Sequence, residues 1–295
     1  MEGASFAAER RAVDAALERF CARHLGDAEP AVAEAVRYSL VGGGKRLRPI
    51  LVLSAYEAAG GRDDAVDLAA AVEVIHAYSL VHDDLPCMDD DEVRRGRPTV
   101  HRAFGVAAAT AAGLAMVPLA VLCVTDAARH LQLPARVRST IVRELMHASG
   151  AAGMIGGQLL DLAGEGLGLT LTQLEHVHRL KTGALIRAAA RVGGLAAGAD
   201  APRLAALDRY GAAIGLAFQI ADDVLDVTST TAELGKTAGR DVALGKSTYP
   251  ALLGVEGAVA RASALADEAC ESLDAVGMLT PRLRFLARFS VERRS

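Results

Sequence analysis

The sequence predicts an all-α protein, a single bundle of about ten or more helices. Hydrophobic residues make up 52% of the 295-residue chain, whereas aromatic residues make up 4% and Trp is absent. Ala and Leu, which are strong helix formers, therefore supply most of the apolar mass. Apolar positions recur with helical spacing and few β-branched runs interrupt them. No stretch is long or disordered enough to be an interdomain linker, so we expect one domain over residues 1–295.

Short breaks rich in Gly and Pro separate the expected helices, since these residues end helical segments. In chain order the breaks are Gly42–Gly44, Gly60–Gly61, Leu133–Pro134, Gly164–Gly168, Gly193–Pro202 and Thr228–Gly245. Each is short enough to be a turn or loop between helices of one bundle.

The stretch Ala103–Thr125 is long and apolar enough to be considered as a membrane span. Ala, Gly, Thr and Pro118 make it only weakly hydrophobic, which favours a buried central helix. The first twenty residues carry charge throughout and contain no apolar core, so they do not read as a signal peptide. We expect no membrane span.

Charge and cysteine usage narrow the function classes. The net charge of -4 and the pI of about 6.1 argue against a general binder of nucleic acid or anionic membranes. The four cysteines, Cys21, Cys87, Cys123 and Cys270, are far apart and form no zinc-ligand or disulfide spacing. A reducing cytoplasm is the expected location.

A first acidic cluster spans Val81–Glu92 and holds five Asp in nine positions at the end of an apolar helical stretch. So many carboxylates are unfavourable there unless something cationic binds. On an ideal helix Asp83 and Asp89 would point about 120° apart, so both can face one ion only if the helix ends between them. Pro86 supplies a reason for that ending.

A second acidic cluster lies at Phe218–Asp226. Asp222 and Asp226 are one helical turn apart and share a face, with Gln219 beside them, so here the helix can remain intact. Carboxylates completed by water and phosphate oxygens are the ligands that Mg²⁺ prefers. Two such clusters facing across a cavity would hold several ions.

The alternative for a single Asp run is a solvated helix end or a nonspecific acidic face. Two clusters weaken this alternative, because both are embedded in apolar sequence and both are matched by basic residues elsewhere. We therefore expect a metal-dependent site.

Seven short motifs in this order resemble the trans-polyprenyl diphosphate synthase family, and most closely its bacterial farnesyl diphosphate synthases. Each motif is weak alone, but their joint occurrence over nearly the whole chain is specific. They are Gly43–Pro49, His76–Arg97, Gly156–Gln158, Lys181–Leu185, Phe218–Asp226, Gly235–Thr237 and Gly245–Pro250.

The resemblance implies a helical bundle around a central cavity, of the isoprenoid synthase type, and a Mg²⁺-dependent site. Asp83, Asp89 and Asp222 would ligate magnesium, with three ions when substrate is bound, and Asp84, Asp223 and Asp226 would lie in or near that shell. The diphosphate of the allylic substrate, or the emerging cation, would be held by Arg94, Lys181, Thr182, Gln219, Lys236 and Lys246. Isopentenyl diphosphate would be bound by Lys45, Arg48, His76 and Arg95. A homodimer is also implied.

The distribution of lysine supports this set independently. Of 32 basic residues only four are Lys, and all four, Lys45, Lys181, Lys236 and Lys246, fall in these motifs. Lys retained only there indicates a need for a compact ammonium charge against phosphate oxygens.

His76 precedes Asp83 by two helical turns on nearly the same face, so it can face the same cavity. A lone His on an apolar helix is otherwise a packed residue with a backbone acceptor. That interpretation is kept for His82, His101, His147, His176 and His178.

The resemblance implies that the allylic diphosphate ionises, that the double bond of isopentenyl diphosphate attacks the resulting cation, and that loss of a proton completes a five-carbon extension. Chain length in the family depends on the residues four and five before Asp83, here Ser79 and Tyr78. A bulky Tyr78, with two extra residues between Asp84 and Asp89, is the pattern of enzymes that make farnesyl diphosphate (C15). Core packing is the alternative role for Tyr78.

Three other functions stay open. A geranylgeranyl (C20) or other short-chain synthase usually has a smaller residue at position 78. A class I terpene cyclase would not need the basic pocket of Lys45, Arg48 and Arg95, and a noncatalytic partner subunit would have lost part of one cluster. The chain departs from the family at Val106 and Leu114, where acidic residues are usual, which bears on packing, the subunit interface or the rate.

Overall fold

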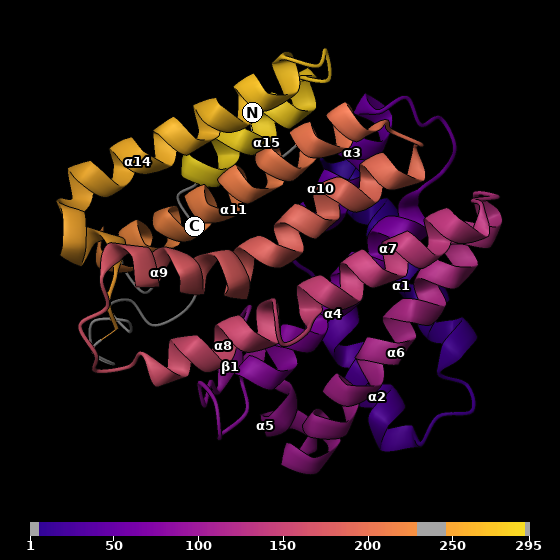
Figure 1. Cartoon of the computed structure of the whole chain (residues 1–295). Helices are drawn as coiled ribbons and strands as arrows, with labels where there is room; N and C mark the ends of the chain where they lie inside the picture. The colour runs from indigo at the N-terminus through magenta and orange to yellow at the C-terminus, as the bar shows by residue number, and fades with distance from the viewer. Residues whose placement is uncertain (1–5, 229–245, 293–295) are drawn as a thin grey trace. The chain divides into compact units, whose positions relative to one another are not determined.

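The computed structural model describes residues 6–228 and 246–292, and the regular secondary structure in these residues is helical apart from one short hairpin (Figure 1). The prediction of an all-α fold is confirmed. The elements are α1 (Ala7–His24), α2 (Pro30–Leu40), α3 (Leu47–Ala58), α4 (Val66–Asp83), β1 (Val93–Arg94), β2 (Arg97–Pro98), α5 (Val100–Phe104), α6 (Val106–His130), α7 (Ala135–Ser149), α8 (Met154–Ala163), α9 (Leu171–His178), the π-helix η1 (Arg179–Gly183), α10 (Ala184–Ala196), α11 (Ala201–Thr228), α14 (Tyr249–Asp274) and α15 (Pro281–Glu292).

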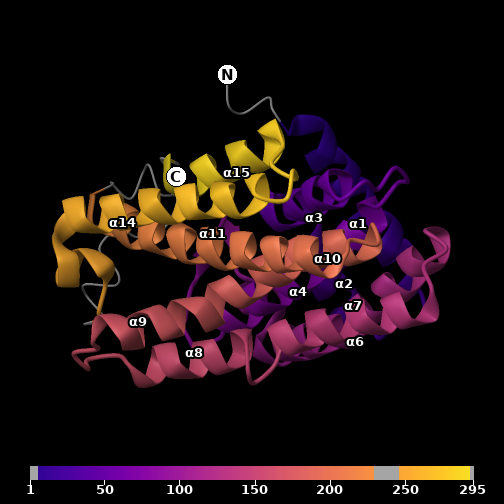
Figure 2. The ribbon, with the colours of Figure 1, turned by 45° about the horizontal axis from the view of Figure 1, so that its top comes forward.

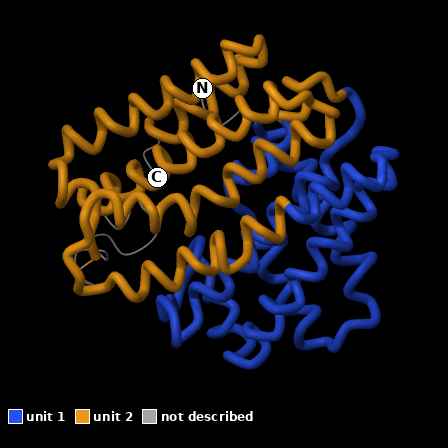
Figure 3. The backbone as a smooth tube through the Cα atoms, in the orientation of Figure 1, with its two compact units in different colours: residues 1–53, 62–143 blue, residues 54–61, 144–295 orange. Residues whose placement is uncertain are grey.

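The chain divides into two compact units (Figure 3). The first contains residues 1–53 and 62–143, and the second contains residues 54–61 and 144–295. The first aspartate cluster belongs to the first unit and the second cluster to the second unit. The expectation of one domain over the whole chain stays a prediction.

In the first unit α4 packs against α1 and α6, and α2 contacts α4 and α6. Most residues of α4 are buried, and among them is the charged Glu73. The helix ends at Asp83, where the amide of Leu85 turns back to the carbonyl of His82 at 3.1 Å. Pro86 follows at once and cannot continue the helical hydrogen bonds. α4 therefore delivers the first cluster at its carboxyl end.

In the second unit α11 packs against α10 and α14, and the three helices lie side by side in both views (Figures 1 and 2). α11 runs unbroken from Ala201 to Thr228, so Asp222 and Asp226 share one intact helix, as predicted. α14 is interrupted at Gly254, whose φ of 71° requires glycine.

Two glycines expected in a break lie inside a helix instead. The sequence predicts a break from Gly193, but α10 continues to Ala196 and the turn is confined to the four residues before Ala201. A Cβ at Gly194 would stand 2.4 Å from Cδ1 of Leu207. Gly194 therefore allows α10 and α11 to pack closely. A rule that treats glycine only as a helix terminator does not predict this role.

α6 covers most of the apolar stretch and is only partly buried. It is long and apolar enough to cross a membrane by length and composition, a test that core helices of soluble proteins also pass. One face, including Met116 and Ala120, is in the core, whereas Leu114 is 62% exposed and Leu122 is 46% exposed. The expected buried helix is thus buried on one side, and both departures from the family pattern, Val106 and Leu114, are on exposed positions.

Candidate active site

The loop of the first cluster folds back onto the end of α4. The amide of Asp89 donates to the carbonyl of Asp83 at 2.8 Å, and the amides of Met88 and Asp90 both donate to the carbonyl of Leu85. This brings the backbone of Asp89 against the backbone of Asp83. The prediction that the helix ends between these two aspartates is confirmed, and the reason is the one expected.

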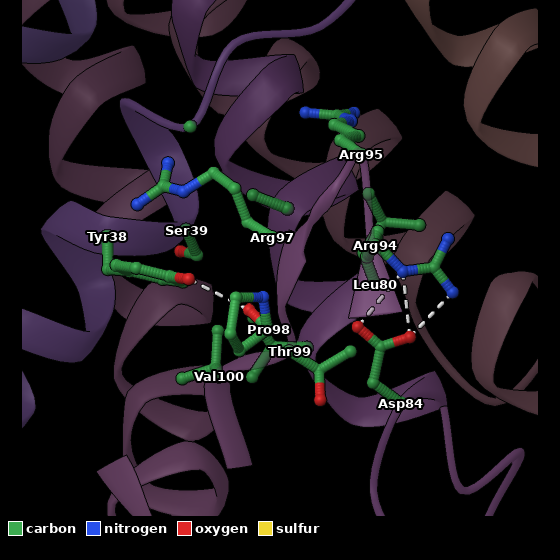
Figure 4. A pocket seen from close by; sticks show the side chains of 13 residues that line it. Tyr38, Ser39, Leu80, Asp84, Arg94, Arg95, Arg97, Pro98, Thr99 and Val100 are labelled. Carbon is green, nitrogen blue, oxygen red and sulfur yellow. Dashed lines mark hydrogen bonds and ion pairs between the residues drawn. The ribbon is translucent and has the colours of Figure 1, made fainter. Parts of the chain in front are cut away.

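Asp84 is engaged within the protein. It is 3% exposed, and Nε of Arg94 donates to its two carboxylate oxygens at 2.7 and 2.9 Å (Figure 4). Burial raises the pKa of Asp84 above its ordinary value, although the Arg94 guanidinium opposes that rise. Nη2 of Arg94 also lies 3.2 Å from Asp91. The pair therefore fixes the hairpin β1–β2 to the end of α4.

A pocket in the first unit is lined by this hairpin on one side and by α4 on another (Figure 4). Arg94, Arg95 and Arg97 reach it from the hairpin, whereas Leu80 and its neighbours on α4 give it an apolar wall. The guanidinium carbon of Arg97 lies 3.9 Å from the centroid of the Tyr38 ring. Such stacking holds a guanidinium without neutralising it. The pocket thus combines three guanidinium groups, one of them paired with Asp84, with an apolar surface.

The glycine-rich loop before Lys45 makes room for Arg95, a second arginine of the hairpin. Nη1 of Arg95 donates to the carbonyl of Gly43. A Cβ at Gly44, whose φ is 142°, would stand 2.7 Å from that Nη1, so glycine is required for the approach. Lys45 itself is exposed. The loop that carries Lys45 therefore contacts Arg95, and both residues are predicted ligands of isopentenyl diphosphate.

Arg46 anchors the same loop in the core. Its guanidinium donates to Glu73 at 2.7 Å, to Asp14 at 2.8 Å and to the carbonyl of Leu40 at 2.8 Å. Burial lowers the pKa of Arg46, but the charges and hydrogen bonds of Glu73 and Asp14 together outweigh this effect and the net pKa is raised. The three contacts hold Arg46 at a φ of 52°, which is unfavourable for a residue with a side chain. Arg46 thereby anchors the backbone between Lys45 and α3.

His76 meets Arg48 at a distance of 3.2 Å between its Nε2 and the arginine Nη1. A guanidinium can only donate, so Nε2 must accept and the imidazole must be neutral. Burial, and then the positive charge of Arg48 and other arginines, lowers the pKa of His76 well below 6.5. His76 therefore acts as a neutral acceptor that orients Arg48.

This contact gives the free energy of unfolding a defined pH dependence. The pKa of His76 is lowered on folding, so below 6.5 the unfolded chain takes up a proton that the folded chain refuses. The free energy of unfolding of the wild type should therefore decrease as the pH is lowered below 6.5. In His76→Gln this decrease should be smaller. The difference between the two slopes should reach at most about 1.4 kcal/mol per pH unit. Denaturant unfolding at about pH 7.5 and about pH 5.5 measures it, and equal slopes would contradict a neutral His76.

In the second unit two motif lysines share one carboxylate. Nζ of Lys181 lies 2.7 Å and Nζ of Lys246 lies 2.9 Å from Oδ2 of Asp161, and Glu165 is 3.3 Å from Lys246. Burial alone would raise the pKa of Asp161, but the two ammonium groups hold it below its ordinary value. Two residues far apart in sequence thus place their charges within reach of one anion.

The π-helix η1 carries Lys181 and Thr182. A Cβ at Gly157 on α8 would stand 2.2 Å from the amide nitrogen of Lys181, so glycine lets α8 and η1 come together. Thr182 donates from Oγ1 to Oε1 of Gln219 on α11 at 2.8 Å. Single π turns of this kind recur at functional sites. The motif Gly156–Gln158 on α8 therefore packs directly against the motif Lys181–Leu185, which begins in η1.

The second cluster divides by exposure. Asp222 is partly exposed, whereas Asp223 is 3% and Asp226 is 4% exposed. Oδ2 of Asp223 lies 3.1 Å from Nε2 of His178 and accepts the amide of Tyr249 at 3.0 Å. Asp223 therefore joins α9, α11 and the start of α14, which fixes the segment that carries Lys246.

The two residues predicted to limit chain length lie on α4. Tyr78 is 7% exposed and packs edge-to-face on His82, with ring centroids 4.9 Å apart. Ser79 is partly buried and its hydroxyl donates to the carbonyl of His76. The structure places Tyr78 in the packed interior of the first unit, which agrees with either of its two expected roles.

Known proteins are similar to this chain in sequence and in fold. The family described as Polyprenyl synthetase matches residues 29–275. Farnesyl diphosphate synthase from Escherichia coli (strain K12) is 51% identical over 267 residues, which are 89% of each chain. Farnesyl diphosphate synthase from Geobacillus stearothermophilus is 45% identical over 252 residues, 85% of this chain and 84% of that enzyme. The crystal structure of an FPP/GFPP synthase from Zymomonas mobilis superposes with a TM-score of 0.85 at 36% identity, covering 96% of this chain and 98% of that one.

The chain belongs to the polyprenyl synthetase family. The resemblance stated from the motifs is therefore confirmed. The matched residues 29–275 include both aspartate clusters and the described lysines. Lys236, the remaining predicted ligand, lies outside the described residues.

The sequence analysis gives no functional role to four residues of this polyprenyl synthetase site. Gln158 belongs to the motif Gly156–Gln158, and Asp161 follows it by three residues on α8, a spacing that could have drawn attention to both. Within the described residues both polar atoms of the Gln158 side chain are buried and lack a hydrogen-bond partner, a costly state that fits a group reserved for a ligand or water. His178 and Glu73 gave no local signal, since each meets its partner only through the fold.

Proposed function

We propose that this chain is a Mg²⁺-dependent prenyl transferase that condenses isopentenyl diphosphate with dimethylallyl diphosphate and then with geranyl diphosphate, giving farnesyl diphosphate (C15). The observation that carries the proposal is the convergence of Lys181 and Lys246 on Asp161 in a chain that retains both aspartate clusters. Ammonium groups gathered around one oxygen form a site that a diphosphate can occupy. The named relatives that make farnesyl diphosphate support the C15 product.

The carboxylates fit magnesium by their chemistry. Hard oxygen donors are supplied by Asp83 and Asp89 in one cluster and by Asp222 in the other. Among residues 6–228 and 246–292 no group of three or more His, Cys, Asp or Glu side chains is placed to hold a metal ion. Mg²⁺ keeps waters and substrate phosphates in its shell, so it needs few ligands from the protein. We propose three ions with substrate bound, which would neutralise the charge that develops on the diphosphate.

The proposed reaction divides the basic residues between two substrates. Arg94, Lys181, Lys246 and Lys236 would hold the allylic diphosphate, while Lys45, Arg48 and Arg95 would hold isopentenyl diphosphate. Neutral His76 would keep Arg48 in place, and Gln219 would orient Thr182. Fixed charges of this kind stabilise a leaving group without reorganising during the reaction.

The proposed steps balance without a protein nucleophile. The bond between the allylic carbon and the diphosphate oxygen breaks, and both electrons leave with pyrophosphate. The double bond of isopentenyl diphosphate attacks the allylic cation and forms the new carbon–carbon bond. A proton from the carbon next to the new cationic centre passes to pyrophosphate, which regenerates a double bond. Thr182 and Gln219 would face the cation with hydroxyl and amide oxygens.

One incubation tests this function. The protein with Mg²⁺, dimethylallyl diphosphate and labelled isopentenyl diphosphate should give farnesyl diphosphate as the main product. Folded protein that forms no elongated product would refute the proposal. A cyclic hydrocarbon formed from geranyl or farnesyl diphosphate, in an incubation without isopentenyl diphosphate, would favour a terpene cyclase instead.

The product length is proposed to depend on Tyr78. Replacing it with alanine removes an aromatic ring from a site that is 7% exposed, so the main product should lengthen from C15 to C20 or more. Mass spectrometry of the products measures the change. Tyr56→Ala, at a buried tyrosine on α3, should leave product length unchanged. Identical products from wild type and Tyr78→Ala would make Tyr78 a packing residue only.

We also propose that the chain forms a homodimer in the cytoplasm, as the family resemblance implies. The exposed apolar residues of α6, among them Leu114 and Leu122, are candidates for the interface. The unusual Leu114 would then add apolar contact where relatives have an acid. Neither nucleic acid nor a membrane is expected as a partner.

A further inference from the structure

His82 lies between Tyr78 and helix α6. It follows Tyr78 by four residues on α4, so the two side chains are neighbours on one helix face. Their rings meet at an interplanar angle of 68°, an edge-to-face arrangement that aromatic rings prefer. The imidazole is therefore a direct support for one side of the Tyr78 ring.

The place of the imidazole is determined by α6. A Cβ at Gly113 would stand 2.1 Å from Nε2 and 2.2 Å from Cδ2 of His82, so the ring occupies the space that any side chain at this position would fill. Nε2 lies 3.2 Å from the carbonyl oxygen of Thr110, which can only accept. The imidazole therefore carries its proton on Nε2 and donates to α6. Shape and a hydrogen bond both fix it.

We infer that His82, through the space left by Gly113, is a specificity-determining residue that sets product length by positioning Tyr78. The inference rests on the proposed function, in which Tyr78 limits chain growth. Tyr78 is almost fully buried on a helix, where few rotamers are open to it. The edge of His82 removes part of the remaining freedom. A product that would need Tyr78 to turn aside is thereby excluded.

The main test is the product ratio of His82→Ala. Losing an aromatic pair of this kind shifts a side-chain population by about two- to tenfold, so the C20 to C15 ratio should rise by about that factor. His101→Ala is the matched control, since His101 is a buried histidine of the same unit that bonds Thr99. Its ratio should equal that of wild type. If His82→Ala does not fold, His82→Asn makes the same test, because it removes the ring and keeps an N–H for Thr110.

Two further measurements test whether His82 acts through Tyr78 and whether Gly113 makes room for it. In a Tyr78→Ala background His82→Ala should cause no further change in product length, because the residue through which it acts is gone. Gly113→Ala should lower Tm in wild type and lower it less in His82→Ala, where the clash is absent. If Tyr78→Ala lengthens the product while His82→Ala and His82→Asn leave it unchanged, the inference is wrong. Absence of farnesyl diphosphate from wild type would overturn the proposed function and this inference with it.

Discussion

Replacing Asp222 with asparagine is expected to lower kcat by about a hundred- to a thousandfold, which is the loss seen when one preorganised electrostatic contact to a reacting group is removed. Asp222 is the more exposed of the aspartates near the end of α11, whereas Asp223 and Asp226 are buried. The substitution removes a negative charge and leaves the shape of the side chain almost unchanged. The Mg²⁺ concentration needed for half-maximal rate should rise as well.

Steady-state kinetics at several Mg²⁺ concentrations measure both effects. The matched control is Asp208→Asn on the same helix, where the carboxylate pairs with Arg187 and Arg191. That variant should retain nearly the wild-type kcat and Mg²⁺ requirement. If Asp222→Asn stayed within a few-fold of wild type, the assignment of the second cluster to magnesium would be wrong.

Replacing Arg46 with methionine is expected to lower the free energy of unfolding by about 3–5 kcal/mol, because it leaves a buried carboxylate without its partner. Glu73 is 2% exposed and has Arg46 at 2.7 Å. The substitution also removes the donors to Asp14 and to the carbonyl of Leu40. Arg46 lies between Lys45 and the first residue of α3. Losing its contacts should displace Lys45, so the KM for isopentenyl diphosphate should rise too.

Denaturant unfolding and a double variant test this account. Arg46→Met/Glu73→Leu replaces both charges by apolar groups and should recover most of the lost stability, since no buried charge is left unpaired. Arg19→Met is the control: it breaks an ion pair with Asp67 at the surface of the same unit and should cost about 1 kcal/mol or less. If Arg46→Met and Arg19→Met lost equal amounts of unfolding free energy, the buried pair would contribute no more to stability than the exposed pair.

The parts of the fold that could be predicted depend on local patterns. Helical spacing and composition indicate the all-α class, and the positions of Asp222 and Asp226 within one turn are fixed by helix geometry alone. The end of α4 near Pro86 follows from the missing amide of proline. In each case the deciding groups are near neighbours in sequence.

The rest depends on contacts between distant segments. Arg46 and Glu73 are 27 residues apart, His178 and Asp223 are 45 apart, and Asp161 and Lys246 are 85 apart. No spacing rule links such pairs, so His178 reads as an ordinary packed histidine although its partner belongs to the second cluster. The packing role of Gly194 has no local signal for the same reason, because the side chain that requires its small size, Leu207, is on the next helix.

Asp161 gives the site a built-in counterion. The charges of Lys181 and Lys246 are partly balanced by this carboxylate, and Glu165 lies 3.3 Å from Lys246. In the proposed reaction an incoming anion must compete with Asp161 for both ammonium groups, so occupancy becomes an exchange of one anion for another. Ligands with several negative oxygens win that exchange more readily than ligands with one or two. The protein would thereby discriminate against prenyl alcohols and monophosphates before any bond is broken.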